Sequence, residues 1–345
     1  MKLGYSELII NPIKETRLVG MGDSKPKANE IEGDLYVRCI IFNEGNRNVA
    51  IISLDSLAIS YNIAERVKEN IIKSFDLNIE VVISCTHTHY APSILNHPYL
   101  CRVDEEYLTL LSEKIIEVIS KCVLNMKENI NIRYNYCFFD EIGKSRITGL
   151  DSKNIFLQRL DFFSDKENIV TIVLHNCHPT ILSVENNKIS SEYPGETIEK
   201  LKARNKDTFF MFLQGAAGDI STRTTRRGQD YNEVNRMANI LTGKVMELDK
   251  GESEPIINMS LKTEIFNINH NIKTLENFTI SQSISNREKE TIQMALGYLQ
   301  ELGENKEYLD NKVRITKVKL NDINLVFNPC ELFSSYLNNF DVSNT

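Results

Sequence analysis

The hydrophobic and polar positions of the chain follow two periods, one typical of strands and one typical of helices. Residues 38–55 contain two apolar runs around the turn-forming sequence NEGN, which predicts a β-hairpin. Residues 62–75 then repeat apolar side chains at the spacing of an amphipathic helix. Residues 80–86 form an apolar run that predicts a buried strand. This part of the chain therefore predicts a hairpin, a helix and a strand in succession.

The rest of the sequence continues to mix the two patterns. Strands are predicted over residues 129–139, 155–163, 169–177, 208–215 and 255–269, and a second hairpin over 313–329. Helices are predicted over residues 104–126, 195–205, 232–248 and 286–303, with a last helix beginning at 330. A polar stretch over 269–283 follows neither pattern. Strand–helix–strand units mixed with hairpins predict an α/β fold, with mixed β-sheets in layers flanked by helices, in a single large domain over residues 1–345.

The composition narrows the class of protein. With 345 residues and 41% hydrophobic positions, the chain can bury a large core. Its formal net charge of −7 argues against a nucleic-acid or membrane surface, so the expected partner is a small-molecule substrate. The seven cysteines form no CxxC pair, and the first residues show no basic segment followed by an apolar one. These features predict reduced thiols and a cytoplasmic protein.

Five of the six histidines lie in two short windows, each associated with a predicted strand. His87 and His89 follow the strand at 80–86, and residues i and i+2 of a strand project to the same face. Both can therefore point off the strand end, where α/β folds place their sites. Imidazole is a common zinc ligand, and catalytic zinc keeps an open position beside its three protein ligands. A structural role is the competing interpretation, and it is favoured for His97 and His175.

Two further motifs contain candidate polar groups. In FLQGAAGDIST, a strand runs into small residues that let the backbone approach a ligand, followed by Asp219 and Ser221 in the expected loop. Gly-Asp after a strand is also common turn chemistry. In FNPCELF, Glu331 lies just after a strand and a proline, at the start of the predicted last helix. A glutamate there more often caps a helix or pairs with its dipole.

In order and character, these segments resemble the catalytic domain of the neutral/alkaline non-lysosomal ceramidase family. Members of that family have a THTHSGP motif, a later HPT with an acidic-aromatic-glycine patch downstream, a GD[IV]SP motif and a PGE. This chain has CTHTHYAPS, NCHPTILSVENNKISSEYPG, QGAAGDIST and NPCELF in the same order. The resemblance extends from about residue 18 to about residue 333.

The resemblance implies a role for each matched residue. It implies one Zn²⁺ per chain, with the metal ligands His87, His178 and Glu331. It implies a catalytic set of His89, Ser221 and Asp219, in which His89 contacts the substrate or leaving group and Ser221 matches the serine assigned to amide cleavage. Arg146, in GKSRITG, matches an arginine that faces the substrate. Asp55 and Asp219 would orient the ligands or the serine loop.

The chain also departs from the family pattern. Tyr90 and Ala91 replace a Ser-Gly pair, Thr222 replaces a proline, and Cys330 replaces the glycine of PGE. The sequence ends at Thr345 without the family's tyrosine segment, which supplies a fourth zinc ligand, and without its C-terminal immunoglobulin-like domain. Three protein ligands and water would then complete the metal site. A catalytically degenerate binding protein is the alternative.

The chemistry predicted from these residues is metal-assisted hydrolysis. Zinc lowers the pKa of a bound water to about 7, water or Ser221 would attack, and His89 could transfer a proton to the leaving amine. Three arginines after the GDIS motif suit recognition of carboxylates or phosphates, although a solvated basic turn explains them equally well: Arg223, Arg226 and Arg227. The sequence therefore predicts a zinc-dependent hydrolase of an amide-like bond in a small, polar, anionic metabolite. A metal-dependent lyase or esterase on the same site is a second alternative, and no oligomeric state is predicted.

Overall fold

The computed structural model describes residues 1–19, 27–95, 103–147, 154–268, 296–297 and 312–339. The polar stretch predicted over 269–283 and nearly all of the helix predicted over 286–303 lie outside the described residues. The same holds for His97 and His270.

The first of two five-stranded sheets is built mainly by the N-terminal part of the chain. Its strand order is β5 (Ile79–Cys85), β4 (Arg47–Leu54), β3 (Tyr36–Glu44), β1 (Lys2–Ile9) and β6 (Lys127–Glu128). β3 and β4 form the predicted hairpin, and β4 pairs in parallel with β5 through the crossover helix α1 (Tyr61–Ser74). The sequence patterns did not predict β1, which pairs antiparallel with β3.

The second five-stranded sheet repeats this mixture of pairings. Its order is β12 (Phe209–Gln214), β10 (Glu167–His175), β9 (Phe156–Ser164), β7 (Asn131–Phe138) and β14 (Glu254–Pro255). β10 pairs antiparallel with β9 and in parallel with β12, and helix α3 (Glu192–Arg204) makes the crossover. The prediction of mixed β-sheets flanked by helices is confirmed.

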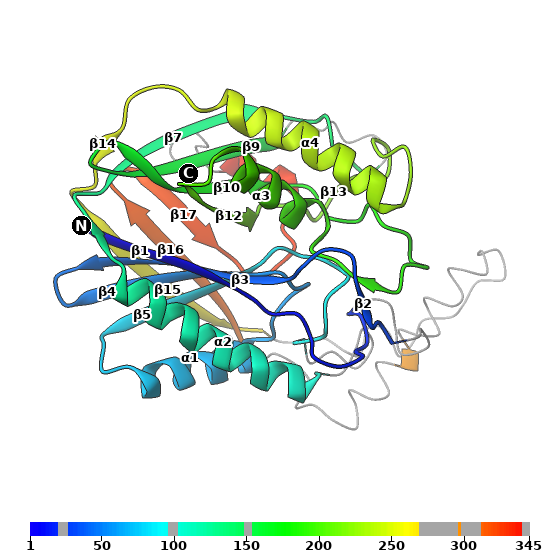
Figure 1. The fold of residues 1–345 in the computed structure, drawn as a ribbon, viewed down its shortest axis with the longest axis horizontal. Coiled ribbons are helices and arrows are strands. Elements are labelled where there is room, and N and C mark those ends of the chain that lie inside the picture. Colours follow the sequence, from blue (N-terminus) through cyan, green and yellow to red (C-terminus); the bar gives the residue numbers. More distant parts are fainter. Residues whose placement is uncertain (20–26, 96–102, 148–153, 269–295, 298–311, 340–345) are drawn as a thin grey trace.

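The two sheets pack face to face, with helices on their outer sides (Figure 1). Alternation along β4 directs Val49 and Ile51 toward the second sheet, whereas Ala50 and Ile52 face helices α1 and α2 (Glu105–Leu124). Helices α3 and α4 (Tyr231–Glu247) cover the second sheet on its outer face. Each fully buried aliphatic side chain contributes about 1.5–3 kcal/mol, so both faces of each sheet stabilise the layers.

A third sheet packs on the core between the two large sheets. It consists of β15 (Met259–Asn267), β16 (Lys312–Leu320) and β17 (Ile323–Phe327). Its side chains Val318, Leu320 and Leu325 are buried in the cluster that joins the two larger sheets. The chain leaves β17 and reaches Glu331 four residues later, so this sheet leads into the segment that contains Glu331.

Short strands and one short helix complete the description. These are β2 (Glu30–Ile31), β8 (Lys144–Ser145), β11 (Lys188–Ile189), β13 (Ile220–Ser221) and the 3-10 helix η3 (Ser334–Asn339). The last helix therefore begins at Ser334 and not at residue 330, so Glu331 lies ahead of it. Within the part of the chain described, no helix has both the length and the apolar character needed to cross a bilayer.

Candidate metal centre

His87 lies just beyond the end of β5, where the backbone adopts an unusual conformation. Its φ is +70°, a left-handed value that costs a non-glycine residue about 1–2 kcal/mol. Two contacts hold it there: its amide donates to the Ser56 carbonyl at 2.9 Å, and its Nδ1 lies 2.9 Å from the Leu57 carbonyl. The strained turn directs the imidazole away from the strand, as expected where a functional group must be held in place.

His178 follows β10 and is oriented in the same way. Its Nδ1 lies 2.6 Å from the carbonyl oxygen of Ala217 and 3.2 Å from that of Ile220. A carbonyl can only accept, so Nδ1 carries the proton in both His87 and His178. Each Nε2 then presents its lone pair outward, which is how backbone contacts prepare histidines to bind a metal.

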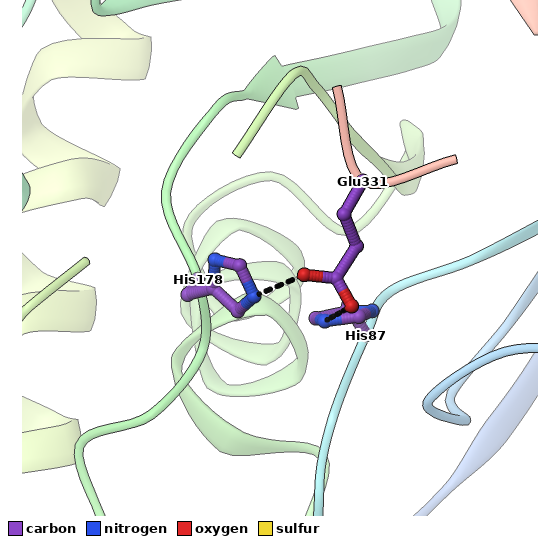
Figure 2. Close-up of side chains that lie close together, drawn as sticks. All are labelled: His87, His178 and Glu331. Atoms are coloured by element: carbon purple, nitrogen blue, oxygen red, sulfur yellow. Dashed lines mark hydrogen bonds and ion pairs between the residues drawn. The ribbon is translucent and has the colours of Figure 1, made fainter. Parts of the chain in front are cut away.

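Glu331 brings a carboxylate between the two imidazoles (Figure 2). Its Oε1 lies 3.4 Å from Nε2 of His87, and its Oε2 lies 3.0 Å from Nε2 of His178. Ligand atoms from the three residues all lie within 4.8 Å of one another. A tetrahedral zinc with ligand bonds of about 2.0–2.1 Å separates its ligand atoms by about 3.3 Å, so the observed spacing fits.

The protonation of the cluster also fits a cation. Burial, with a further contribution from His178, lowers the pKa of His87 to about 4. The hydrogen bond with His178 lowers the pKa of Glu331 to about 2, against the opposing effect of burial. Near neutral pH, His87 is therefore neutral and Glu331 ionised, as a divalent metal requires of its ligands. A metal ion between Nε2 of His178 and Oε2 of Glu331 would take the place of the proton in the hydrogen bond that joins them at 3.0 Å.

His89 lies beside this cluster without belonging to it. Its ring centroid is 5.4 Å from that of His87 and 6.5 Å from that of His178. Its Nε2 is buried and has no hydrogen-bond partner among the described residues. Burial, followed by the neighbouring His87 and His178, lowers the pKa of His89 to about 3. His89 is thus a neutral imidazole next to the three-residue cluster.

A cavity of about 430 Å³ borders His87, His178 and Glu331. Its other walls come from residues 57–59, from the ends of β5, β10 and β12 and from β17, and most of these side chains are apolar. The apolar walls are Leu57, Ala58, Ile59, Ile83, Leu174, Leu213, Ala217, Leu325, Val326 and Phe327. No lysine or arginine is among the described residues that line it.

Comparison with known proteins identifies the fold of the chain. The sequence matches no protein-family model and no curated protein. Two solved structures are similar: neutral ceramidase from Pseudomonas aeruginosa, with a TM-score of 0.72, and a ceramidase complexed with C2, with a TM-score of 0.73. The chain has a ceramidase-like fold. The match covers 94% of this chain and 61% and 62% of the two ceramidases, at 15% identity. The chain therefore spans about three fifths of their length.

The ceramidase-like fold confirms the resemblance predicted from the four motifs. It does not test the roles of single residues, because 15% identity establishes the fold alone. The predicted ligands His87, His178 and Glu331 do come together, although 153 positions separate His178 from Glu331 in the sequence.

Ser221 and Asp219 lie near the cluster of His87, His178 and Glu331 but are buried. Ser221 is 1% exposed and sits on strand β13, bridged to His178, so the loop expected at this position is instead a short buried strand. Its Oγ accepts one long contact, 3.5 Å from the Arg223 amide. Asp219 is 3% exposed and accepts two hydrogen bonds from Ser334. Their catalytic roles remain predictions.

Arg146 and the later arginines are placed differently relative to the cluster. Arg146 donates from Nε and Nη2 to the Gly218 carbonyl, at 3.2 and 2.6 Å, and its charge acts on His87, His89 and Glu331. Arg226 donates from Nη1 to the carbonyls of Thr180 and Ile181, in the turn after His178. The side chains of Arg223 and Arg227 are exposed. Substrate binding by these arginines remains a prediction.

Two buried acidic side chains hold the segments that contain His87 and His178. Asp55, predicted to orient ligands, accepts from Thr86, the residue before His87, and forms an ion pair with buried Arg38. Glu192 lies in SSEYPG, at the end of the motif that begins with NCHPT, but the sequence indicated no role for it. Its Oε1 accepts from the amides of Ile181 and Leu182, at 2.7 and 2.8 Å, and so holds the turn that follows His178.

Proposed function

We propose that this protein is a zinc-dependent hydrolase that cleaves an amide-like bond. The observation that carries the proposal is the cluster of His87, His178 and Glu331, in which both imidazoles present Nε2 toward one carboxylate. The ceramidase-like fold supports it. A zinc ion bound by these three residues would supply Lewis-acid polarisation of a carbonyl and a water with a pKa near about 7.

The residues around the cluster suggest how a substrate would be handled. His89 has an unpartnered Nε2 and a pKa of about 3, far below the pH at which a general base works best. We therefore assign His89 to hydrogen bonding with the substrate or leaving group. Arg146 donates to the Gly218 carbonyl and does not line the cavity, so it would act through the effect of its charge on the cluster rather than through contact with the substrate. The burial of Ser221 favours water over Ser221 as the attacking group.

The cavity favours a particular kind of substrate. Outside the three-residue cluster most of its lining side chains are apolar, and Arg226 already donates to backbone carbonyls. These contacts support an amide whose acyl or amine part is apolar and lies in the cavity. The anionic metabolite predicted from the arginine cluster is the alternative. Its negatively charged group would have to lie outside the cavity, because no lysine or arginine is among the described residues that line it.

The test combines metal analysis with a substrate panel. Purified protein should contain about one zinc per chain and lose hydrolysis on chelation. The panel compares two series of amides. One carries aliphatic groups of increasing length, the other has the same lengths but ends in a carboxylate, and kcat/KM is measured for each compound. Zinc binding without turnover of any amide or ester would support the binding-protein alternative. Absence of bound zinc after supplementation would contradict the proposed site.

A further inference from the structure

The loop of residues 217–220 contacts both His178 and the segment that contains Glu331. The carbonyls of Ala217 and Ile220 face Nδ1 of His178. On the other side, the Gly218 amide donates to the Leu332 carbonyl at 2.8 Å. A Cβ added at Gly218 would lie 2.3 Å from the carbonyl oxygen of Glu331, so only glycine allows this approach.

Asp219 makes the most specific contact between the two segments. Its Oδ1 accepts from the Ser334 amide at 2.6 Å, and its Oδ2 accepts from the Ser334 hydroxyl at 2.8 Å. Asp219 is 3% exposed and Ser334 is 4% exposed, so both hydrogen bonds are shielded from water. Hydrogen bonds to a buried charged group are stronger than neutral ones, and the loss of one partner leaves the charge poorly satisfied.

The segment between β17 and η3 needs such an anchor. Residues 328–333 belong to no strand or helix, and the Glu331 side chain is 56% exposed. Neither a sheet ladder nor burial in a core therefore fixes the direction of this carboxylate. The two hydrogen bonds at Ser334 hold the backbone three residues beyond Glu331.

We infer that Asp219 is a positioning residue, which latches the Glu331 segment to the loop that orients His178. The Asp219–Ser334 latch thereby sets the 3.0 Å separation between Glu331 and His178. This role rests on the proposed metal site, and it assigns Asp219 to the geometry of the ligands rather than to contact with the substrate.

The experiment measures zinc affinity by chelator competition in four variants: Ser334→Ala, Asp219→Asn, Glu331→Gln and the double variant Ser334→Ala/Glu331→Gln. Ser335→Ala is the matched control, because Ser335 is the exposed neighbour of Ser334. Loss of a group that orients a ligand typically lowers metal affinity about 10–100-fold. We expect that range for Ser334→Ala and Asp219→Asn, and no change for Ser335→Ala.

The double variant separates a latch from general destabilisation. If Ser334 acts through Glu331, Ser334→Ala should have little further effect once Glu331 is glutamine. An equal loss in both backgrounds, or unchanged affinity in Ser334→Ala and Asp219→Asn, would overturn the inference. If Asp219→Asn does not fold, Ser334→Ala alone carries the test.

Amide hydrogen exchange of the metal-free protein distinguishes failure of the latch from failure of the metal site. Exchange at the Ser334 and Leu332 amides should accelerate in Asp219→Asn and stay unchanged in Ser335→Ala. If the protein binds no zinc but shows this acceleration, the latch stands and the proposed function fails. If exchange is unchanged in Asp219→Asn, the latch fails whatever the metal result.

Discussion

The two histidines and the glutamate of the candidate metal cluster are held by different kinds of structure. The side chains of His87 and His178 are 11% and 4% exposed, and a backbone carbonyl fixes the orientation of each ring. The side chain of Glu331 is 56% exposed and comes from an irregular segment. The imidazoles are thus preorganised by the core, whereas the carboxylate depends on a few tertiary contacts.

This difference teaches where the site is rigid and where it can adjust. Buried rings that face carbonyls can rotate little, so they define the position of a bound ion. An exposed carboxylate on an irregular segment can shift at lower cost. Substitution of His87 or His178 should therefore abolish metal binding, whereas substitution of Glu331, or of the residues that hold its segment, should weaken it.

The largest effect is expected from removing a histidine ligand. His87→Ala should lower zinc affinity by more than about 100-fold, because it deletes a preorganised ligand, whereas His89→Ala should retain the metal. Metal content after desalting measures both. Equal retention of zinc in the two variants would remove the ligand assignment.

The contributions of the histidines and of Glu331 to the unfolding free energy should be lost over separate pH ranges. The folded pKa values of His87 and His89, about 4 and about 3, lie below the unfolded value of about 6.5, so the folded state binds fewer protons. Stability from neutral histidines is present above pH 6.5 and is lost as pH falls toward 4. For His87 the loss is up to about 3 kcal/mol. The pKa of Glu331, about 2, lies below its unfolded value of about 4.5, so its contribution is lost below pH 4.5, and solvent screening reduces that contribution because the side chain is half-exposed.

Urea unfolding of the chelator-treated protein at pH 7, 5.5 and 4.5 measures the histidine window. His89→Asn, which cannot titrate there, should flatten the decline. An unfolding free energy that stays constant over this range would contradict the buried, neutral state of these rings.

Glu331→Gln should have an intermediate effect. The amide keeps the shape but loses the charge, so zinc affinity should fall about 10–100-fold, less than in His87→Ala. The unfolding free energy should stay within about 0.5 kcal/mol, because the side chain is half-exposed. A loss of affinity equal to that of His87→Ala would show that the histidines and Glu331 are equally preorganised.

The smallest effects are expected at the arginine cluster. Arg226→Ala should cost about 1 kcal/mol of stability, since it removes hydrogen bonds to the turn after His178, and Arg227→Ala should cost less than about 0.5 kcal/mol. Neither should change the salt dependence of kcat/KM for apolar amides. A salt-sensitive preference for carboxylate-bearing amides, lost in either variant, would instead restore the anionic substrate.

The sequence by itself determined the local elements and the candidate ligands. The hairpin of β3 and β4 and the strands that end before His87 and His178 follow from apolar periodicity, which depends only on neighbouring residues. The order of four motifs was enough to predict a ceramidase-like fold. Glu331 was selected through that order, since its local context favoured a capping role.

Only the tertiary structure decided which of the candidate residues are buried and what they contact. Ser221 is buried because β13 pairs with β8, and Arg226 donates to the turn after His178, so neither matches its local pattern. The apolar cavity forms only where β17 lies beside the ends of β5 and β12, although some 240 residues separate β5 from β17. Sequence periodicity reports which face of an element is buried, but not which distant element covers it. The substrate-facing wall and the placement of Glu331 depend on such long-range packing.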